Sequence, residues 1–335
     1  MYTQFQSDPP TRTKATEALY LKRYQSLYKR FSKETGENDL DPNDVVARLM
    51  MMKYDLCMSS WRQYRTAVLF VMESRFPQYN VAIESLLAET SEGLSKKSQK
   101  TSARKIKNVP APAWKALQTA LAVRAAAGYK YAKGLLSVLH ATLLTGLRPI
   151  EWCFSEIVSE TETNRPILKI RNSKHTNGRA NGEYRELYLD ELTEHQVDHI
   201  KAAIECCRID ASATDVEIGK AAASRELALK HELESARDST LPKSGKAMSS
   251  ITLYSFRHQF IADAKATFSD PVIIAAMAGH KSTSTAFTHY GKRKNASGTI
   301  KVTPTIASIE AVLTVHAELY KKFLSTKNRS NSLSM

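Results

Sequence analysis

The chain of 335 residues is 42% hydrophobic and 24% charged, which is ordinary for a globular protein of two domains or one large domain. A chain of this length can bury a core without a disulfide or a metal ion. Its formal net charge of +14 favours a polyanionic partner, and nucleic acid is the usual one.

The beginning of the chain lacks a basic stretch followed by an apolar run, so we expect no signal peptide. The most apolar segment, 135–144, is too short to span a bilayer. We therefore expect no membrane partner and a cytoplasmic location.

Residues 13–90 are predicted to form a small helical domain. Apolar and aromatic side chains recur there at helical spacing, first at Tyr20, Tyr24, Leu27, Tyr28 and Phe31. Asp41-Pro42 is typical of the start of a second helix, and Ser59 or Ser60 can cap a third.

Basic residues in this part of the chain are candidates for DNA contact. Arg62 and Arg65 lie off the apolar stripe of the third helix, so they either face solvent or contact DNA phosphates. Segment 91–109 is rich in small polar residues and has no acidic residue after Glu92, which predicts a flexible cationic linker. Its basic residues either stay solvated or contact DNA, and they are Lys96, Lys97, Lys100, Arg104, Lys105 and Lys107.

Residues 110–325 are predicted to form a second, larger domain of helices with a small β-sheet. Leu135 to Leu147 reads as a helix that brings Arg148 to its end. Alternating apolar residues then predict two strands joined by a polar connection that carries Lys174; these strands span 167–171 and 184–189.

The rest of this domain is predicted to be helical. Segment 191–247 has mixed charge and shows no motif. Segment 304–324 has the apolar periodicity of an amphipathic helix, and 326–335 is a flexible tail. The fold class we expect is therefore mainly α with a small β-sheet.

The chain contains four cysteines, and no two form a Cys-x-x-Cys pair; they are Cys57, Cys153, Cys206 and Cys207. No histidine cluster completes a metal-binding set with them. We predict that all four are reduced and structural, as in a reducing compartment, and that the protein holds no metal ion.

Five residues of the second domain have the chemistry needed to cleave a phosphodiester without a metal; they are Arg148, Lys174, Arg257, His280 and Tyr290. Attack on phosphorus puts extra negative charge on the non-bridging oxygens, which the guanidiniums of two arginines can bind in place of metal ions. A tyrosine phenol can attack and form a covalent intermediate. A lysine can protonate the departing 5′ oxygen, and a histidine can donate to the phosphate.

Each of these residues also has an ordinary structural explanation. Arg148 can interact with the end of a helix, Lys174 can be a solvated turn residue, His280 can belong to a simple turn, and Tyr290 can be a core residue. The joint order, with Glu151 three residues after the first arginine, favours a catalytic set over these separate explanations.

The local contexts are Thr145-Gly146-Leu147-Arg148, Ser255-Phe256-Arg257-His258, Ala278-Gly279-His280 and His289-Tyr290-Gly291. This set resembles the active site of the tyrosine recombinases, also called the integrase family, over residues 110–293. The resemblance implies a helical core-binding domain over 13–90 and an α+β catalytic domain over 110–325. It also implies that Glu151 is a carboxylate that orients the site.

The family's activity implies a site-specific recombinase that cleaves and rejoins DNA strands through a 3′-phosphotyrosyl intermediate, without a cofactor. The partners implied are double-stranded DNA with a specific recombination site, three further copies of the chain in a homo-tetramer, and accessory DNA-binding proteins. The location implied is the bacterial cytosol, in association with DNA, as for integrases of mobile elements.

Two features depart from the family pattern. Tyr254 stands where the family usually has a histidine, and the interval from His280 to Tyr290 is one residue longer than expected. We expect Tyr254 to donate a hydrogen bond to a phosphate oxygen and not to shuttle a proton, and the alternative is a core tyrosine without a role. The alternatives for the whole protein are DNA relaxation by type IB topoisomerase-like chemistry and a non-catalytic DNA-binding protein of the same fold.

Overall fold

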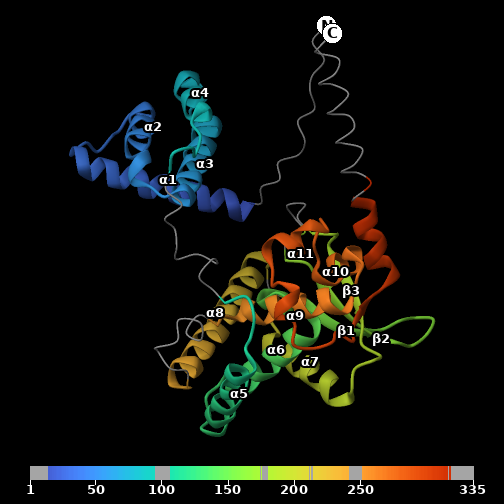
Figure 1. Cartoon of the computed structure of the whole chain (residues 1–335). Helices are drawn as coiled ribbons and strands as arrows, with labels where there is room; N and C mark the ends of the chain where they lie inside the picture. Colours follow the sequence, from blue (N-terminus) through green and yellow to red (C-terminus); the bar gives the residue numbers. More distant parts are fainter. Residues whose placement is uncertain are drawn as a thin grey trace, which may run out of the picture. The chain divides into compact units, whose positions relative to one another are not determined.

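The computed structural model describes residues 14–94, 106–173, 175, 180–210, 212, 214–240, 251–315 and 317. They belong to two compact units, which divide between Arg104 and Lys105 (Figure 1). This division lies inside the segment 91–109 that the sequence predicts to be a linker. No helix in the described part of the chain is long and apolar enough to cross a membrane.

The first unit is helical and has its own apolar core, which includes the buried side chains of Phe31, Leu49 and Trp61. Asp41 caps the second helix as predicted, since its carboxylate accepts a 2.8 Å hydrogen bond from the backbone N–H of Asn43. The third helix begins earlier than the predicted cap. The elements are α1 (Lys14–Thr35), α2 (Pro42–Met51), the 3-10 helix η1 (Met52–Asp55), α3 (Met58–Arg75) and α4 (Asn80–Ala88).

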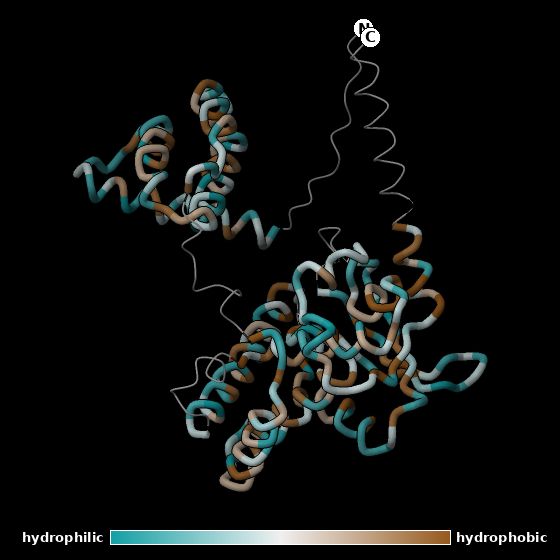
Figure 2. Tube along the Cα trace, viewed as in Figure 1, coloured by the Kyte–Doolittle hydropathy of each residue, from teal (hydrophilic) through white to brown (hydrophobic). Residues whose placement is uncertain are grey.

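The second unit is built around α9, whose side chains are buried on almost every side. Hydrophobic and hydrophilic stretches alternate along the helices of both units, as expected where one helix face packs on a core (Figure 2). Residues 306–315 are also helical. The helices are α5 (Ala111–Ala126), α6 (Ala132–Thr145), η3 (Pro149–Phe154), α7 (Glu194–Cys207), α8 (Asp215–Thr240), α9 (Leu253–Thr267), α10 (Pro271–Ala278), α11 (Ser284–His289) and η6 (Arg293–Asn295).

A four-stranded antiparallel sheet accompanies these helices, with its strands in the order β1-β2-β3-β4. The two predicted strands correspond to β2 and β3, and the mainly helical fold with a small sheet is confirmed. The strands are β1 (Ser155–Ser159), β2 (Pro166–Arg171), β3 (Tyr184–Tyr188) and β4 (Thr303–Pro304).

The inner face of β3 carries a charged residue. In β3 the buried positions are Arg185 and Leu187, which pair in register with Ile170 and Leu168 of β2. A strand with one buried face normally alternates apolar with polar residues. Arg185 therefore occupies a core position and needs polar partners inside the protein.

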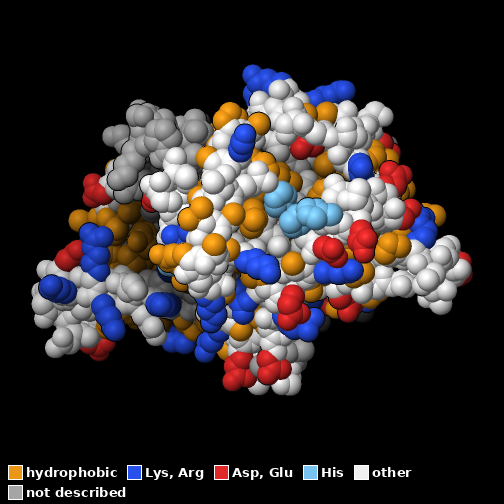
Figure 3. Space-filling model, turned by 90° about the horizontal axis from the view of Figure 1, so that it is seen from below, with side chains coloured by type: hydrophobic (Ala, Val, Ile, Leu, Met, Phe, Trp, Pro, Cys, Tyr) orange, Lys and Arg blue, Asp and Glu red, His pale blue; other side chains and the backbone are white. Residues whose placement is uncertain are grey.

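An aromatic stack connects three helices to α9. The ring of His140 on α6 lies parallel to that of His199 on α7, with centroids 4.3 Å apart. Trp114 of α5 contacts both His140 and Phe256, at centroid distances of 4.8 and 5.2 Å. The stack continues toward the exposed His195, and Figure 3 shows histidine side chains side by side at the molecular surface.

Burial, together with the charges of His199 and His195, lowers the pKa of His140 from 6.5 to about 4. Between these two pH values the unfolded chain binds a proton that the folded chain does not, so stability falls as the pH falls through this window. Replacing His140 with Phe keeps the stacked ring and removes the titration. We expect this His140→Phe variant to show a flatter dependence of its urea-unfolding midpoint on pH from 6.5 to 4.

The matched control is His231→Phe, because His231 is exposed on α8. The urea-unfolding midpoint of this control should change with pH as it does in the wild-type protein. A His140→Phe protein whose midpoint falls as steeply as the wild type would contradict the assignment of this titration to the stack.

Candidate active site

Arg148 is placed by the sharp turn that ends α6. Gly146 adopts φ 70°, a left-handed conformation that glycine favours, and a Cβ at this position would overlap the ring of Phe260 on α9. Arg148 then stands at the N-cap of η3. Its backbone N–H donates to Glu151 Oε2 at 2.8 Å and its Nη1 donates to Oε1 at 2.5 Å. One carboxylate thus fixes both the backbone and the side chain of Arg148.

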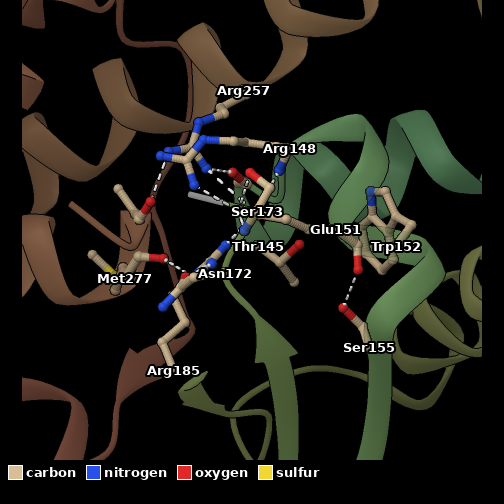
Figure 4. A network of polar contacts seen from close by, with 12 residues as sticks. Thr145, Arg148, Glu151, Trp152, Ser155, Asn172, Ser173, Arg185, Arg257 and Met277 are labelled. Atoms are coloured by element: carbon tan, nitrogen blue, oxygen red, sulfur yellow. Dashed lines mark hydrogen bonds and ion pairs between the residues drawn. The ribbon is translucent and has the colours of Figure 1, made fainter. Parts of the chain in front are cut away.

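Glu151 is fully buried and lies at the centre of a polar network (Figure 4). Its Oε2 accepts from Arg185 Nη2 at 2.7 Å and lies 4.0 Å from Arg257 Nη1. Its Oε1 accepts from the backbone N–H and the hydroxyl of Ser173, both at 3.2 Å. Burial alone would raise the pKa of Glu151, but the charges of Arg185, Arg148 and Arg257 hold it well below its usual value. Glu151 is therefore ionised.

All three nitrogens of the Arg185 guanidinium have hydrogen-bond partners. Its Nε donates to the carbonyl of Met277 at 2.9 Å, and its Nη1 donates to Asn172 Oδ1. Gly279 has φ 63°, and a Cβ there would overlap both Asn172 Oδ1 and the Arg185 guanidinium. The glycine in Gly279-His280 therefore has two local functions, since it ends α10 and leaves room for Arg185.

Arg257 extends from α9 into the same network. Its Nη1 donates to the carbonyl of Gly146 at 2.5 Å, and its Nη2 donates to the carbonyl of Ala278 at 2.7 Å. Burial, followed by repulsion from Arg148, lowers the pKa of Arg257 to about 10, so the group is still charged at neutral pH. No described residue offers a hydrogen-bond partner to its buried Nε.

His280 lies next to Arg257, with its Nε2 at 3.1 Å from Arg257 Nη2. A guanidinium only donates hydrogen bonds, so Nε2 accepts and the proton of a neutral imidazole is on Nδ1. Burial, followed by the charges of Arg257 and Arg148, lowers the pKa of His280 well below its usual value. Its Nδ1 is buried and has no hydrogen-bond partner among the described residues. His280 is thus a neutral donor at neutral pH.

Tyr290 immediately follows α11 and completes the group. Its ring centroid lies 4.9 Å from that of His280 and 4.9 Å from that of His258. The Cζ atom of Arg257 lies 5.2 Å from the same centroid. The structure therefore brings together residues from three separate parts of the sequence, namely Arg148 with Glu151, Arg257, and His280 with Tyr290.

Two lysines hold the segment that carries Tyr290. Lys265 of α9 is buried, and its Nζ donates to the carbonyls of Ala286 and Gly291 at 2.8 and 2.7 Å. Lys107 Nζ donates to the carbonyl of His289 at 3.0 Å. These contacts fix the backbone on both sides of the tyrosine.

Tyr254 lies in the first turn of α9, with 36% of its surface exposed. Burial and the charge of Glu226 raise the pKa of its phenol, which opposes any role as a base. The charges of Arg257 and Arg148 act on the pKa of this phenol in the opposite direction. Tyr254 stands one helical turn before Arg257 on α9, and its hydrogen bond to a phosphate stays a prediction.

Other predicted residues lie elsewhere or outside the described part. Arg62 is exposed, and its Nη2 donates to Ser91 Oγ at 3.3 Å. Arg65 donates to the carbonyls of Leu86 and Leu87 at the end of α4, each at 2.7 Å. DNA contact by these arginines stays a prediction. The residues outside the described ranges are Lys174, Lys96, Lys97, Lys100, Arg104 and Lys105.

Sequence reasoning missed Arg185 and Lys265. Each had one signal, namely a basic residue at a position where the apolar periodicity of a strand or a helix requires burial. Among the described residues, no group of three or more His, Cys, Asp or Glu side chains is placed to hold a metal ion.

Comparison with protein-family models gives no match to this chain, and comparison with curated proteins gives none either. The functional argument therefore depends on the residues of the site and their geometry.

Replacing Arg185 with Met should destabilise the second unit strongly. The change removes one buried donor from Glu151 and the Nη1 donor from Asn172 Oδ1, and loss of one partner of a buried ion pair costs about 3–5 kcal/mol in free energy of unfolding. The control is Arg171→Met, because Arg171 pairs with Glu183 at 3.1 Å on the exposed side of the same sheet. That change should cost about 0–1 kcal/mol. Equal losses in urea unfolding for the two variants would show that the network does not stabilise the fold.

Replacing Lys265 with Met should loosen the segment around Tyr290. Two carbonyls lose their donor, so we expect faster hydrogen–deuterium exchange of the amides of residues 286–291. Lys301→Met, at an exposed position, should leave this exchange unchanged. Unaltered exchange in the Lys265→Met protein would mean that other contacts fix the segment.

Proposed function

We propose that this protein is a site-specific DNA strand transferase that cleaves and rejoins DNA through a covalent bond between Tyr290 and a 3′ phosphate. The observation that carries the proposal is the charge of the buried cluster around the tyrosine. Three guanidiniums, of Arg148, Arg185 and Arg257, are buried there, and among the described residues Glu151 is the one carboxylate that pairs with them.

The three guanidiniums and the one carboxylate give this buried cluster a net charge of +2. Buried charge without a partner is unfavourable, so this arrangement is suited to an anion. A five-coordinate phosphorus transition state carries additional negative charge on its non-bridging oxygens, and fixed donors stabilise such charge strongly in a dry site. The Arg257 guanidinium lies beside the Tyr290 ring, Arg148 pairs with the same Glu151 carboxylate, and the ion pair of Arg185 fixes that carboxylate from the other side of the network.

The reaction assigns one role to each side chain. The phenol of Tyr290 gives up its proton to water as its oxygen attacks phosphorus, the bond from phosphorus to the 5′ oxygen breaks, and the 5′ oxygen leaves with a proton. Lys174 is the proposed donor of that proton, and the neighbouring Ser173 is anchored on Glu151. His280, with its proton on Nδ1, donates to a non-bridging oxygen. In the reverse direction a 5′ hydroxyl attacks the phosphotyrosine and releases Tyr290, so no external energy source is required.

The proposed substrate is double-stranded DNA that contains a specific recombination site, and the net charge of +14 supports a polyanion. We further propose assembly as a homo-tetramer on DNA and a location in the cytosol, where the DNA is. The first, helical unit is the proposed core-binding domain, with the exposed Arg62 as a candidate for phosphate contact.

The proposal is tested with short duplexes tiled across the DNA that flanks the gene, each nicked so that cleavage releases a short fragment and traps the adduct. The wild-type protein should form a covalent adduct on one site, visible as a shifted band under denaturing conditions. Tyr290→Phe should bind the same duplex with unchanged affinity and form no adduct, because only the phenol oxygen is removed.

An undiminished adduct with Tyr290→Phe would place the nucleophile elsewhere. Adducts on every duplex without sequence preference would indicate DNA relaxation in place of recombination. Binding by the wild-type protein without any adduct would indicate a non-catalytic DNA-binding protein.

Tyr254→Phe tests the departure from the family pattern. If the phenol donates one hydrogen bond to phosphate, its removal should slow cleavage by about 2- to 12-fold, which corresponds to roughly 0.5–1.5 kcal/mol. Tyr184→Phe, at an exposed position of β3, is the matched control and should cleave at the wild-type rate. A Tyr254→Phe protein as inactive as Tyr290→Phe would give Tyr254 a larger role, and an unaffected one would make it a structural residue.

A further inference from the structure

The end of the predicted linker lies against α9 of the second unit. Residues 106–109 form no helix or strand, and two side chains of α9 hold their backbone. The hydroxyl of Ser255 donates to the carbonyl of Ile106 at 2.8 Å, and the backbone N–H of Val109 donates to Gln259 Oε1 at 3.0 Å. The side chains of Ile106 and Val109 pack on the apolar core of this unit. This stretch is therefore a fixed part of the second unit.

The segment around Tyr290 touches the same stretch. A Cβ at Gly291 would lie 2.5 Å from the carbonyl oxygen of His258 and 3.0 Å from that of Lys107, so the absence of a side chain lets these backbones approach. The Nζ of Lys107 also donates to the carbonyl of His289 at 3.0 Å. Lys107 therefore contacts the chain on both sides of Tyr290, with its side chain before the tyrosine and with its backbone after it.

One buried amide joins the two segments further along. Gln259 accepts from Val109 through Oε1, and its Nε2 donates to the carbonyl of Asn295 and to Ser297 Oγ, both at 2.9 Å. The side chain of Gln259 is buried, and hydrogen bonds in such a place are electrostatically stronger than in water. The end of the linker and the segment that follows Tyr290 are thus bound to the same side chain.

We propose that residues 106–109 are a strap that positions the nucleophile, and that Lys107 is the positioning residue of this strap. Lys107 then acts on Tyr290 through the backbone of His289, and it is not one of the residues by which the linker contacts DNA phosphates. This assignment rests on the proposed function, because the placement of Tyr290 affects a reaction only if its phenol attacks phosphorus. The contacts of the strap do not depend on that function.

The hydrogen bond from Lys107 acts directly on the placement of Tyr290. The carbonyl of His289 belongs to the same planar peptide unit as the N–H and the Cα of Tyr290, so fixing this oxygen restricts where the tyrosine begins. The preceding helix, α11, has only six residues. A displacement of about 1 Å in a reacting group can lower a reaction rate by on the order of a hundredfold. Loss of the bond should therefore slow the chemical step and leave DNA binding unchanged.

The test replaces Lys107 with Met and with Arg in the full-length chain. The Met variant loses the donor to His289, so the amides of residues 286–291 should exchange faster with deuterium. Arg can still donate, so Lys107→Arg should keep the exchange of the wild-type protein. The matched control is Lys115→Met, which removes the same charge at an exposed position of α5 and should also leave this exchange unchanged.

Cleavage of the nicked duplex is measured in a single turnover with the DNA fully bound, beside the affinity for the same duplex over a range of salt concentrations. Lys107→Met should lower the cleavage rate of the bound duplex by about tenfold or more, with the affinity and its salt dependence unchanged. Lys107→Arg should restore the rate. A phosphate contact would have the opposite signature, because its loss weakens binding and lowers the log–log salt slope by about 0.9.

That opposite signature, with a normal cleavage rate once the DNA is bound, would overturn the assignment of Lys107. Unchanged exchange of residues 286–291 in Lys107→Met would overturn the strap itself. Faster exchange in this variant, without any cleavage by the wild-type protein, would leave the strap in place and refute the proposed function.

Discussion

The ion pairs of Glu151 are the interaction on which the rest of the second unit depends. Three guanidiniums are buried within reach of this one carboxylate, and without it they would have no negative partner among the described residues. A buried charge that loses its partner costs several kcal/mol, so the network can exist only when η3, β3 and α9 are all in place. Folding and assembly of the site are therefore the same event.

The backbone shows the same dependence at two glycines. Gly146 ends α6 in a left-handed conformation that presses against Phe260, and its carbonyl accepts from Arg257. Gly279 ends α10 in the same conformation, makes room for Arg185 and is followed directly by His280. Both turns thus place a site residue and at the same time contact an arginine of the network. In both Thr-Gly-Leu-Arg and Gly-His, the glycine conformation therefore determines where the following site residue lies.

Much of the site could be predicted from the sequence, because only a few residue types can perform each step of phosphodiester cleavage. Arg148, Arg257, His280 and Tyr290 were proposed from their order and local contexts, and the structure brings them together. Arg185 could not be assigned in this way, since its partner Glu151 lies 34 residues away and their contact depends on how the sheet packs on η3. Strand β4 was missed because it spans only two residues, and β1 was missed because its two apolar residues, Ile157 and Val158, are adjacent and do not alternate with polar ones.

The central claim is that the phosphorus atom of a cleaved DNA strand becomes bonded to Tyr290 inside this arginine cluster. The most direct measurement is mass spectrometry of a trapped protein–DNA adduct after nuclease and protease digestion, which locates the residual nucleotide on one side chain. The account predicts a single modified peptide, with the nucleotide on Tyr290 through its 3′ phosphate. A nucleotide on Tyr254, or on any other residue, would contradict it.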